Sequence, residues 1–581
     1  MEVSYVGIIV CILMAVRGDV ILEERGYLKL PDRNNNYRYD SGTAKESAFD
    51  HQRKLLYVVG EDTQMLHVVN LNNVGNLESI LNHNFDPFID GAPLDVELCV
   101  TPLDTVVAIS FESTANPQAE GHVVLYEPVT TGSAVLTPKN PTDPRITVGA
   151  HPGTIKFTSD CRRVLVSNEG SPGLVDGEFI DPPGSVSVIN LFGSTPSVTT
   201  VQFINVDQPS ERDRLLGLGV RWQIRTNPTT GEVNPFSHNI EPEYIAISPN
   251  NGYAYVTLQE NNAVARIDLE NFYVADIYPM GEKEWQYSYL DASDQDSAVL
   301  MKKHDIKSFY QPGKISFFEW KSKLYLVTAD EGAPITVPDL SFTDYDRALS
   351  LHTKDEFKVD SQLDAELSTN SQLGRLYVSH YHDGRNLVNG KIETVHAFGG
   401  RGFSVFNAQT MIRDWESGDQ IEKYSRMFYP DTFNGDSTNG DFTPTQEKDS
   451  QSPITGPSLN AIVDGEYNGK KLLILASGKS GLLYVYELAD SVSTRTNLLF
   501  QSVHRRGSIT DTWTRLYSAG TIGDAGIEDL TFIPLSESPV TGSPVLVVVS
   551  SKSGTVSTYT FKEDQFPSTA DGGVCRPPSF N

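Results

Sequence analysis

The chain has 581 residues, of which 75 are Asp or Glu and 46 are Lys or Arg, so its formal net charge is −29. Such a protein lacks the basic surface that displaces the counterions of nucleic acid, which excludes nucleic acid as a natural partner. Cations, or surfaces that present cations, are more natural partners. Only 21% of the residues are charged and 39% are hydrophobic, a composition typical of a folded globular protein.

The first residues resemble a secretion signal. An apolar run covers residues 6–16, and the small residues Val16 and Gly18 suit signal peptidase. Because the run is too short to span a bilayer, we predict a signal peptide at residues 1–18 with cleavage before Asp19. No later segment has the length of a membrane span, and residues 564–581 form a polar tail. The mature chain is therefore expected to be secreted and soluble.

A unit of short strands is repeated along residues 19–563. Each copy contains a strand, an Asp/Asn/Gly turn, a strand of the type "YVxx", a polar turn and a strand of the type "VxVxxL". The copies lie at residues 48–71, 97–128, 154–191, 238–269, 314–334 with a later strand at 402–409, 458–488 and 528–561. Alternating β-branched and aromatic residues favour strands, and helical periodicity is scarce.

Four short antiparallel strands cannot bury an apolar face alone, but repeated sheets arranged radially can close into a propeller. We therefore predict an all-β fold, a seven-bladed β-propeller, in which residues 19–30 supply the outer strand of the last blade. Six or eight blades, or a tandem pair of β-sandwiches, are the alternatives. Two segments interrupt the repeat: a long connection at 201–237 and an insertion at 335–398, whose stretch 344–376 is the one clear helical pattern.

Three cysteines remain after the signal is removed. Cys99 and Cys161 occupy strand positions of neighbouring units, so we expect them to form a disulfide. Cys575 would then be a spare thiol or would form an intermolecular bridge.

Carboxylates recur where strands end. In a propeller, the start of each inner strand and the turn between the second and third strands meet at one mouth of the central channel. Five of the seven turns carry Glu, and the other two carry Lys479 and Lys552. Oxygen ligands of this kind suit Ca²⁺. We predict a calcium-binding face formed by Glu169, Glu241, Glu243, Asp330, Glu331, Asp524, Glu528 and Asp529.

Other segments give weaker signals. Residues 430–442 are rich in Asp and Asn but do not fit an EF-hand loop, so we expect a disordered acidic loop there. Arg401 is expected to secure an insertion to a blade. No motif of a nucleophilic hydrolase, a zinc protease or a P-loop is present in the sequence.

Three stretches, "QLGRLYVSH…VHAFGGRGFSVFNAQ", "IEPEYIAISPNNGYAYVTLQENNAVARIDL" and "GDAGIEDLTFIPLSESPVTGSPVLVVVSSKSGTVSTYTF", resemble the mesenchyme-specific cell surface glycoprotein family. Bacterial propeller proteins of the choice-of-anchor type are its relatives. The resemblance covers residues 21–561 and implies a secreted or surface-anchored propeller associated with biomineralised skeletons and shells, with calcium binding. Some bacterial members carry an alkaline phosphatase label.

The chain departs from this family at several places. Where relatives have an Asp-rich stretch, "HYHDGRNLVNG" contains one acid, Asp383, and "QSPITGPSLNA" has no carboxylate where relatives have Pro and Glu. Lys479 and Lys552 replace Glu in the last two turns. The family's binding role is therefore carried over only to Glu241, Glu243, Asp524 and Glu528.

These observations predict a secreted, acidic matrix protein of a biomineralised skeleton or shell. It would bind calcium ions or a calcium carbonate surface through many weak contacts, together with other matrix proteins. The alternatives are a metal-dependent phosphatase-like hydrolase and a pure protein–protein scaffold.

Overall fold

The computed structural model describes residues 19–102, 104–193, 195–380, 387–388, 390–489 and 497–564, and within them the chain forms seven four-stranded antiparallel sheets. Blade 1 contains β2 (Glu46–Asp50), β3 (Leu55–Gly60), β4 (Met65–Asn70) and β5 (Glu78–Asn84). Blade 2 contains β6 (Pro93–Val100), β7 (Thr105–Phe111), β8 (Glu120–Tyr126) and β9 (Arg145–Ala150). Blade 3 contains β10 (Pro152–Phe157), β11 (Arg163–Asn168), β14 (Ser185–Asn190) and β15 (Ser197–Gln202). Blade 4 contains β16 (Pro242–Ile247), β17 (Tyr253–Leu258), β18 (Ala263–Asp268) and β19 (Tyr273–Pro279).

The remaining blades follow the same order with longer connections. Blade 5 contains β22 (Ile315–Trp320), β23 (Lys323–Asp330), β31 (Gly402–Asn407) and β32 (Arg413–Glu416). Blade 6 contains β33 (Leu459–Tyr467), β34 (Lys470–Ser477), β35 (Leu482–Ala489) and β36 (Asn497–Arg505). Blade 7 contains β37 (Ile527–Ile533), β38 (Val545–Ser550), β39 (Thr555–Asp564) and β1 (Asp19–Lys29).

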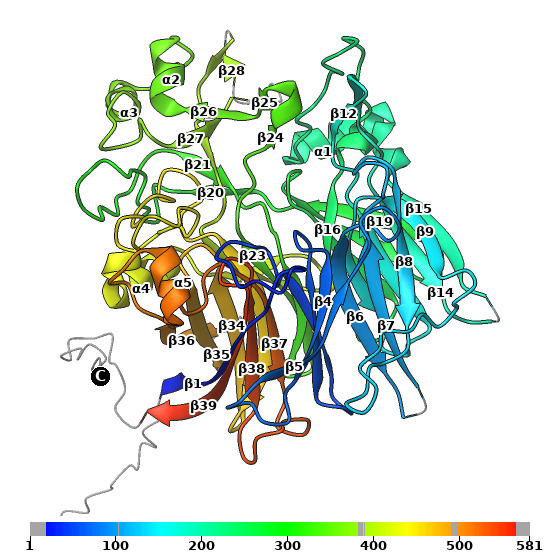
Figure 1. Ribbon diagram of the computed structural model, residues 1–581. Helices are drawn as coiled ribbons and strands as arrows, with labels where there is room; N and C mark the ends of the chain where they lie inside the picture. Colours follow the sequence, from blue (N-terminus) through cyan, green and yellow to red (C-terminus); the bar gives the residue numbers. More distant parts are fainter. Residues whose placement is uncertain are drawn as a thin grey trace, which may run out of the picture.

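The first strands of neighbouring blades contact one another in a closed ring, in the order β2, β6, β10, β16, β22, β33, β37 and back to β2. The sheets are thus arranged as the blades of a β-propeller, and the predicted fold class is confirmed (Figure 1). Because a ring of sheets leaves only short outer edges, each blade can bury both of its faces against its neighbours.

The two ends of the described chain close the ring. β1 pairs with β39 from Asp19 opposite Asp564 to Lys29 opposite Thr555, so the N-terminal strand completes blade 7 as predicted. Its side chains alternate: Val20 and Leu22 are buried, whereas Ile21 is half-buried. Leu22 lies opposite Phe561 and belongs to a cluster that also includes residues of blade 6. Closure therefore rests on apolar packing between blades as well as on the strand ladder.

Apolar clusters lie between adjacent blades. In one of them, Leu165 and Val186 of blade 3 pack against Ile245 and Val256 of blade 4, and all four side chains are buried. Such packing on both faces explains why the inner strands carry long apolar runs instead of a strict alternation.

Helices and short strands occur in the connections between the blade strands. The helices are α1 (Pro209–Leu218), α2 (Ala348–Thr353), α3 (Ser361–Leu367), α4 (Gln420–Phe428) and α5 (Trp513–Ala519). The additional strands are β12 (Gly173–Val175), β13 (Glu178–Ile180), β20 (Glu282–Glu284), β21 (Lys307–Phe309), β24 (Thr336–Val337), β25 (Phe342–Thr343), β26 (Tyr345–Arg347), β27 (Tyr377–Ser379), β28 (Leu387–Val388), β29 (Lys391–Ile392) and β30 (His396–Phe398). Figure 1 shows that α1, α2 and α3 stand above one face of the propeller.

Buried Leu351 and Leu363 of the insertion form one apolar core with Trp285 of the connection between blades 4 and 5. The helical pattern at 344–376 is confirmed, because it contains α2 and α3. In contrast, α1, α4 and α5 were not predicted. The apolar residues of α4, Ile421, Tyr424 and Phe428, do recur at helical spacing, so in that helix the signal was present and was overlooked.

Arg401, which was expected to secure an insertion to a blade, directly precedes β31 and links blade 5 to the connections before and after that blade. Its buried guanidinium donates to the Asp291 carbonyl at 2.6 Å, to Glu422 Oε1 at 2.9 Å and to the Ser452 carbonyl at 2.5 Å.

The prediction of a disordered loop at 430–442 is wrong. Asn434 Nδ2 donates to Glu422 Oε1 at 2.7 Å and to Ser452 Oγ at 3.0 Å, and both Asn434 and Glu422 are buried. Asp436 accepts a hydrogen bond from Gln451 Nε2 at 2.6 Å. The polar residues that suggested disorder thus form the hydrogen bonds that order this segment.

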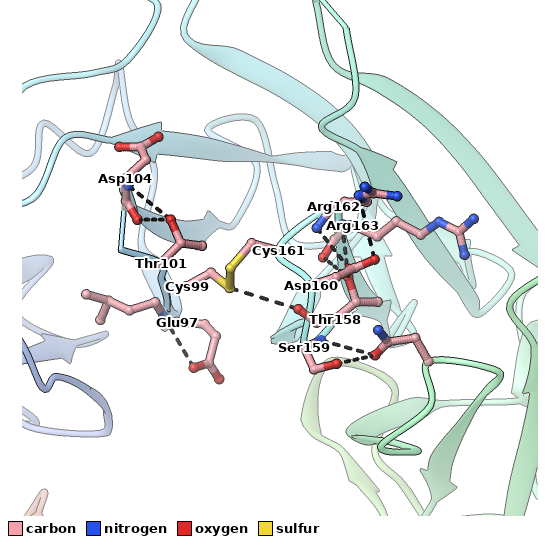
Figure 2. Close-up of a disulfide and its surroundings, with 12 residues drawn as sticks. Glu97, Cys99, Thr101, Asp104, Thr158, Ser159, Asp160, Cys161, Arg162 and Arg163 are labelled. Carbon is pink, nitrogen blue, oxygen red and sulfur yellow. Dashed lines mark hydrogen bonds and ion pairs between the residues drawn. A yellow bond between two sulfur atoms is a disulfide. The ribbon is translucent and has the colours of Figure 1, made fainter. Parts of the chain in front are cut away.

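The predicted disulfide between Cys99 and Cys161 is confirmed, and its Cα atoms are 5.7 Å apart (Figure 2). Cys99 lies near the end of β6 and Cys161 lies in the turn after β10, so the bond links blades 2 and 3. The same turn is held by Cys161 N donating to the Thr158 carbonyl at 2.9 Å. The bond closes a loop of 62 residues and so restricts the unfolded chain.

Some predictions fall on residues outside the described ranges: the signal peptide at 1–18, most of the tail, Cys575 and Asp383. Within those ranges, the chain has no helix whose length and hydropathy would let it cross a membrane.

Truncating Leu22 tests the closure. We expect Leu22→Ala to lower the free energy of unfolding by about 2–4 kcal/mol, because it leaves a cavity in the cluster between blades 6 and 7. Ile21→Ala is the matched control, since its side chain is half-buried on the opposite face, and it should cost less. Urea unfolding followed by tryptophan fluorescence measures both. Equal midpoints for the two variants would contradict a closure that depends on this packing.

Candidate functional site

The mouth of the channel is built from the first residues of the inner strands. Five of these strands have a register irregularity there: between Pro93 and Asp95, Pro152 and Ile155, Pro242 and Ile245, Leu459 and Ala461, and Ile527 and Asp529. A bulge leaves its extra residue out of the ladder and redirects the side chain. Glu243, Asn460 and Glu528 are such extra residues. The irregularities therefore turn polar side chains of three blades toward the mouth.

A second set of carboxylates comes from the turns between the second and third strands. In blade 4 the turn closes with Asn262 N donating to the Gln259 carbonyl at 3.0 Å, and Asn262 adopts φ +56°. The turn of blade 1 has the same form, with Gln64 N donating to the Glu61 carbonyl at 3.0 Å. Recurrence of the turn is what places the recurring Glu near the channel.

Two small cavities lie among these groups. One, of about 120 Å³, is lined by Lys45, Glu46, Asp95, His151, Glu169 and Glu243, with Leu94, Gly153, Thr154 and Tyr244. The other, of about 240 Å³, is lined by Glu331, Asp436, Lys479, Glu528 and Lys552, with Ser437, Ser458, Asn460, Gly478 and Gly526. The two lysines that replace Glu thus lie in a cavity together with three carboxylates.

Lysines neutralise much of the mouth. Lys314 Nζ lies 2.7 Å from Glu46 Oε2 and 3.4 Å from Asp529 Oδ1, so it joins blades 5, 1 and 7. Burial opposes the charge of Lys314, but these two carboxylates outweigh it and raise the pKa of the amine. Lys45 pairs with Glu61, and Lys156 pairs with Glu97.

These three lysines were not predicted from the sequence, because only acidic residues were considered at the starts of the strands. The signal was present, since Lys45 and Lys314 each directly precede an inner strand.

His151 is a further cation. Its Nδ1 lies 3.3 Å from Glu112 Oε1 and its Nε2 lies 3.5 Å from Glu169 Oε2. Burial disfavours the charged imidazole, but Glu169 and Glu112 raise its pKa to about 9. His151 is therefore protonated at neutral pH and compensates two of the turn carboxylates.

The carboxylates around blade 4 are not compensated in this way. Within the described residues, Glu241, Glu243 and Glu260 form no ion pair, and the Glu241 side chain is only 6% exposed. Burial, together with repulsion from Glu260 and Glu169, raises the pKa values of Glu241 and Glu243 well above the ordinary range. Burial and Glu169 raise the pKa of Glu260 to about 8.

Polar neighbours hold the same group in place. With its amide nitrogen toward the carboxylate, Gln259 donates to both oxygens of Glu243 at 3.2 and 2.8 Å. The carbonyl of Glu260 accepts a hydrogen bond from Arg221 Nη1 at 3.1 Å, and Arg221 in turn forms a buried ion pair with Asp344 of the insertion at 2.6 Å. The long connection and the insertion therefore border the uncompensated part of the mouth.

The eight predicted residues separate into three groups. Glu169, Glu241, Glu243, Glu331 and Glu528 lie at the mouth, and Asp529 lies there too but is paired with Lys314. Asp330 and Asp524 were wrongly placed. Asp330 accepts from Thr328 Oγ1 at 2.7 Å and Ser404 Oγ at 2.6 Å inside blade 5. Asp524 accepts hydrogen bonds from Ser557 and Tyr559 inside blade 7.

The described residues contain no group of three or more His, Cys, Asp or Glu side chains arranged to hold a metal ion. The uncompensated carboxyls supply the oxygen donors that Ca²⁺ prefers, but not a preformed coordination shell.

Residues 45–491 match the choice-of-anchor I domain family. The chain is 30% identical over 351 residues to the mesenchyme-specific cell surface glycoprotein of Strongylocentrotus purpuratus, covering 55% of this chain and 44% of that protein. It is 32% identical over 190 residues to Gigasin-3a of Magallana gigas, covering 32% and 64%. The chain therefore spans less than two thirds of the length of either relative. These matches confirm the resemblance seen in the sequence.

Among solved structures, the chain is similar to Saccharomyces cerevisiae Sqt1, with a TM-score of 0.41 and 8% identity over 94% of this chain and 99% of that one.

The raised carboxyl pKa values predict an inverse dependence of stability on pH. In the folded protein Glu260 titrates near pH 8 and Glu331 near pH 7, whereas an unfolded Glu titrates near 4.5. Between these values the folded state binds more protons than the unfolded state, so stability present below about pH 4.5 is lost as the pH rises toward 8. The melting temperature in a metal-free buffer should fall over this window.

Two variants separate this effect from other titrations. Glu241→Gln/Glu243→Gln should raise the melting temperature at pH 8 by a few degrees and flatten the pH profile, because it removes the repelling charges. Glu97→Gln should lower the melting temperature, because Lys156 loses its ion-pair partner. If the double substitution left the dependence of the melting temperature on pH unchanged, ionisation of Glu241 and Glu243 would not lower the stability of the fold, and the prediction would be contradicted.

Proposed function

We propose that this chain, which belongs to the choice-of-anchor I domain family, acts outside the cell as an acidic matrix or cell-surface protein that binds Ca²⁺ or a calcium-bearing mineral surface and other matrix components. One of the relatives is by name a cell surface glycoprotein. The observation that carries the proposal is the group of uncompensated carboxyls formed by Glu241, Glu243 and Glu260 at the mouth.

A divalent cation would change the electrostatics of this group. Without a cation, burial and mutual repulsion keep the carboxyls protonated near neutral pH. A cation entering from the mouth would replace these protons, and the repulsion would become attraction. Binding should therefore release protons and strengthen as the pH rises.

The rest of the surface would add to this binding. The net charge is −29, and exposed carboxylates such as Glu270 and Glu319 lie away from the mouth. Weak contacts from many carboxylates on one rigid propeller would add through effective concentration, so that a mineral face is held more tightly than a single ion. Adsorption of this kind should weaken with added salt.

Calcium titration by calorimetry at pH 6 and pH 8, with melting curves in the same buffers, tests the proposal. We expect saturable heats that depend on the ionisation enthalpy of the buffer, tighter binding at pH 8 and a higher melting temperature in calcium. Glu241→Gln/Glu243→Gln should remove most of the calcium-dependent rise. The control Glu270→Gln/Glu319→Gln, which removes two exposed carboxylates, should keep it.

Adsorption to calcium carbonate crystals in increasing NaCl is the second measurement. Loss of the calcium-dependent melting shift with retained, salt-sensitive adsorption would assign binding to the general acidic surface instead of the mouth. Absence of both effects at millimolar calcium would contradict the proposal and favour a protein–protein scaffold.

A further inference from the structure

A cavity of about 750 Å³ lies away from the mouth, between the outer strands of blades 6 and 7. β36 and β1 form its floor, and the C-terminal ends of α4 and α5 border it. Figure 1 shows α4 and α5 side by side above β36. The volume is within the range of small-molecule sites, about 300–1,000 Å³.

Aromatic residues form part of its wall. Tyr27, Phe428 and Tyr429 line it, together with Ile509, and all four are half-buried. Hydrogen bonds fix two of these rings, because Tyr27 Oη donates to the Gly523 carbonyl at 3.3 Å and Tyr429 Oη accepts from Arg505 N at 3.1 Å. The wall is thus preformed and presents ring surfaces to the cavity.

Arg505 is the unusual polar group of this cavity. Its Nε donates to the Ser480 carbonyl at 3.3 Å and its Nη1 donates to the Gly507 carbonyl at 3.2 Å, which orients the guanidinium. Among the described residues, no carboxylate lies within ion-pair distance of it. Burial lowers its pKa to about 10, so Arg505 keeps its positive charge but lacks a counter-ion.

The other cationic groups of the cavity already have partners. Arg506 Nε lies 3.5 Å from Glu24 Oε2, and its Nη1 donates to the Gly26 carbonyl at 2.9 Å. His504 Nε2 lies 3.1 Å from Glu24 Oε1. Asp431 is exposed at the rim. Arg505 is therefore the cation to which a bound anion would supply the missing counter-ion.

We propose that this cavity binds a small amphipathic organic anion, with the anionic head on the Arg505 guanidinium and the apolar body against Tyr27, Phe428 and Tyr429. A planar guanidinium with free donors forms paired hydrogen bonds to carboxylate or sulfate oxygens, and these bonds are strongest where water is excluded. The aromatic walls supply apolar contact to the body of such a ligand.

Two fluorescent probes with similar bodies test the role of charge: 8-anilinonaphthalene-1-sulfonate, which is an anion, and N-phenyl-1-naphthylamine, which is neutral. We expect one saturable site for the anion per folded chain. Arg505→Gln should weaken binding of the anion about tenfold or more, as expected for the loss of a charge-assisted contact. Binding of the neutral probe should change less than about twofold, because its apolar contacts remain.

Controls address folding and location. Arg505 lies over the Trp513 ring, and Arg162 is an exposed guanidinium that lies over the Phe192 ring in blade 3. Arg162→Gln should leave the binding of both probes unaffected. Ile509→Trp should fill the cavity and weaken both probes without removing a charge. Melting curves identify any variant that loses its fold, and Arg505→Lys, which keeps the charge, should retain part of the anion affinity.

Competition then identifies the head group, since decanoate and decyl sulfate share a chain length and differ in the anion. Displacement of the anionic probe by either supports the proposal and indicates a carboxylate or a sulfate ligand. Failure of both to compete would overturn it. Equal weakening of the two probes by Arg505→Gln, or binding of the anionic probe at many weak sites, would also overturn it.

Discussion

Closing a ring of blades brings the starts of all inner strands to one mouth, and the charges carried there must be accommodated together. Lys314 shows that blades distant in sequence share one set of ion pairs. It lies at the start of blade 5 and contacts Glu46 of blade 1 and Asp529 of blade 7. Without the lysine, the carboxylates of Glu46 and Asp529 would lie near each other without a cation on the adjacent blades 1 and 7, and their repulsion would oppose the closure that β1 and β39 complete.

Compensation is uneven around the ring. Lys45, Lys156 and Lys314 hold carboxylates of blades 1, 2 and 7, and His151 lies between the turn carboxylates of blades 2 and 3. Blade 4 supplies three carboxyls and no cation of its own at the mouth. A structure that needed only solubility would have no reason to bury Glu241 among like charges, since a buried unpaired carboxyl costs stability wherever it ionises. The uneven compensation therefore singles out blade 4 within a mouth that is otherwise balanced by lysines and His151.

The repeats allowed much of the fold to be predicted from the sequence, including closure by residues 19–30 and the return of blade 5 at 402–409 after its insertion. The same reasoning placed Glu241, Glu243 and Glu528 correctly because strand starts and turns have fixed positions in a blade. It misplaced Asp330 and Asp524, whose partners Ser404 and Tyr559 come from other strands of the same blades. It could not locate the bulges, because an extra residue in a strand has no sequence signature of its own.

The mouth is formed by the repeated blade unit, whereas the cavity at Arg505 is formed by elements that occur once. The chemistry of the mouth therefore changes only when several copies change. The elements that form the cavity are α4, α5 and the paired edge of β36 and β1. Most of its residues, including Tyr27 and Arg505, lie outside the segment 45–491 that matches the family. A site on such non-repeated elements can acquire its own ligand while the ring and the charge balance of its mouth stay intact.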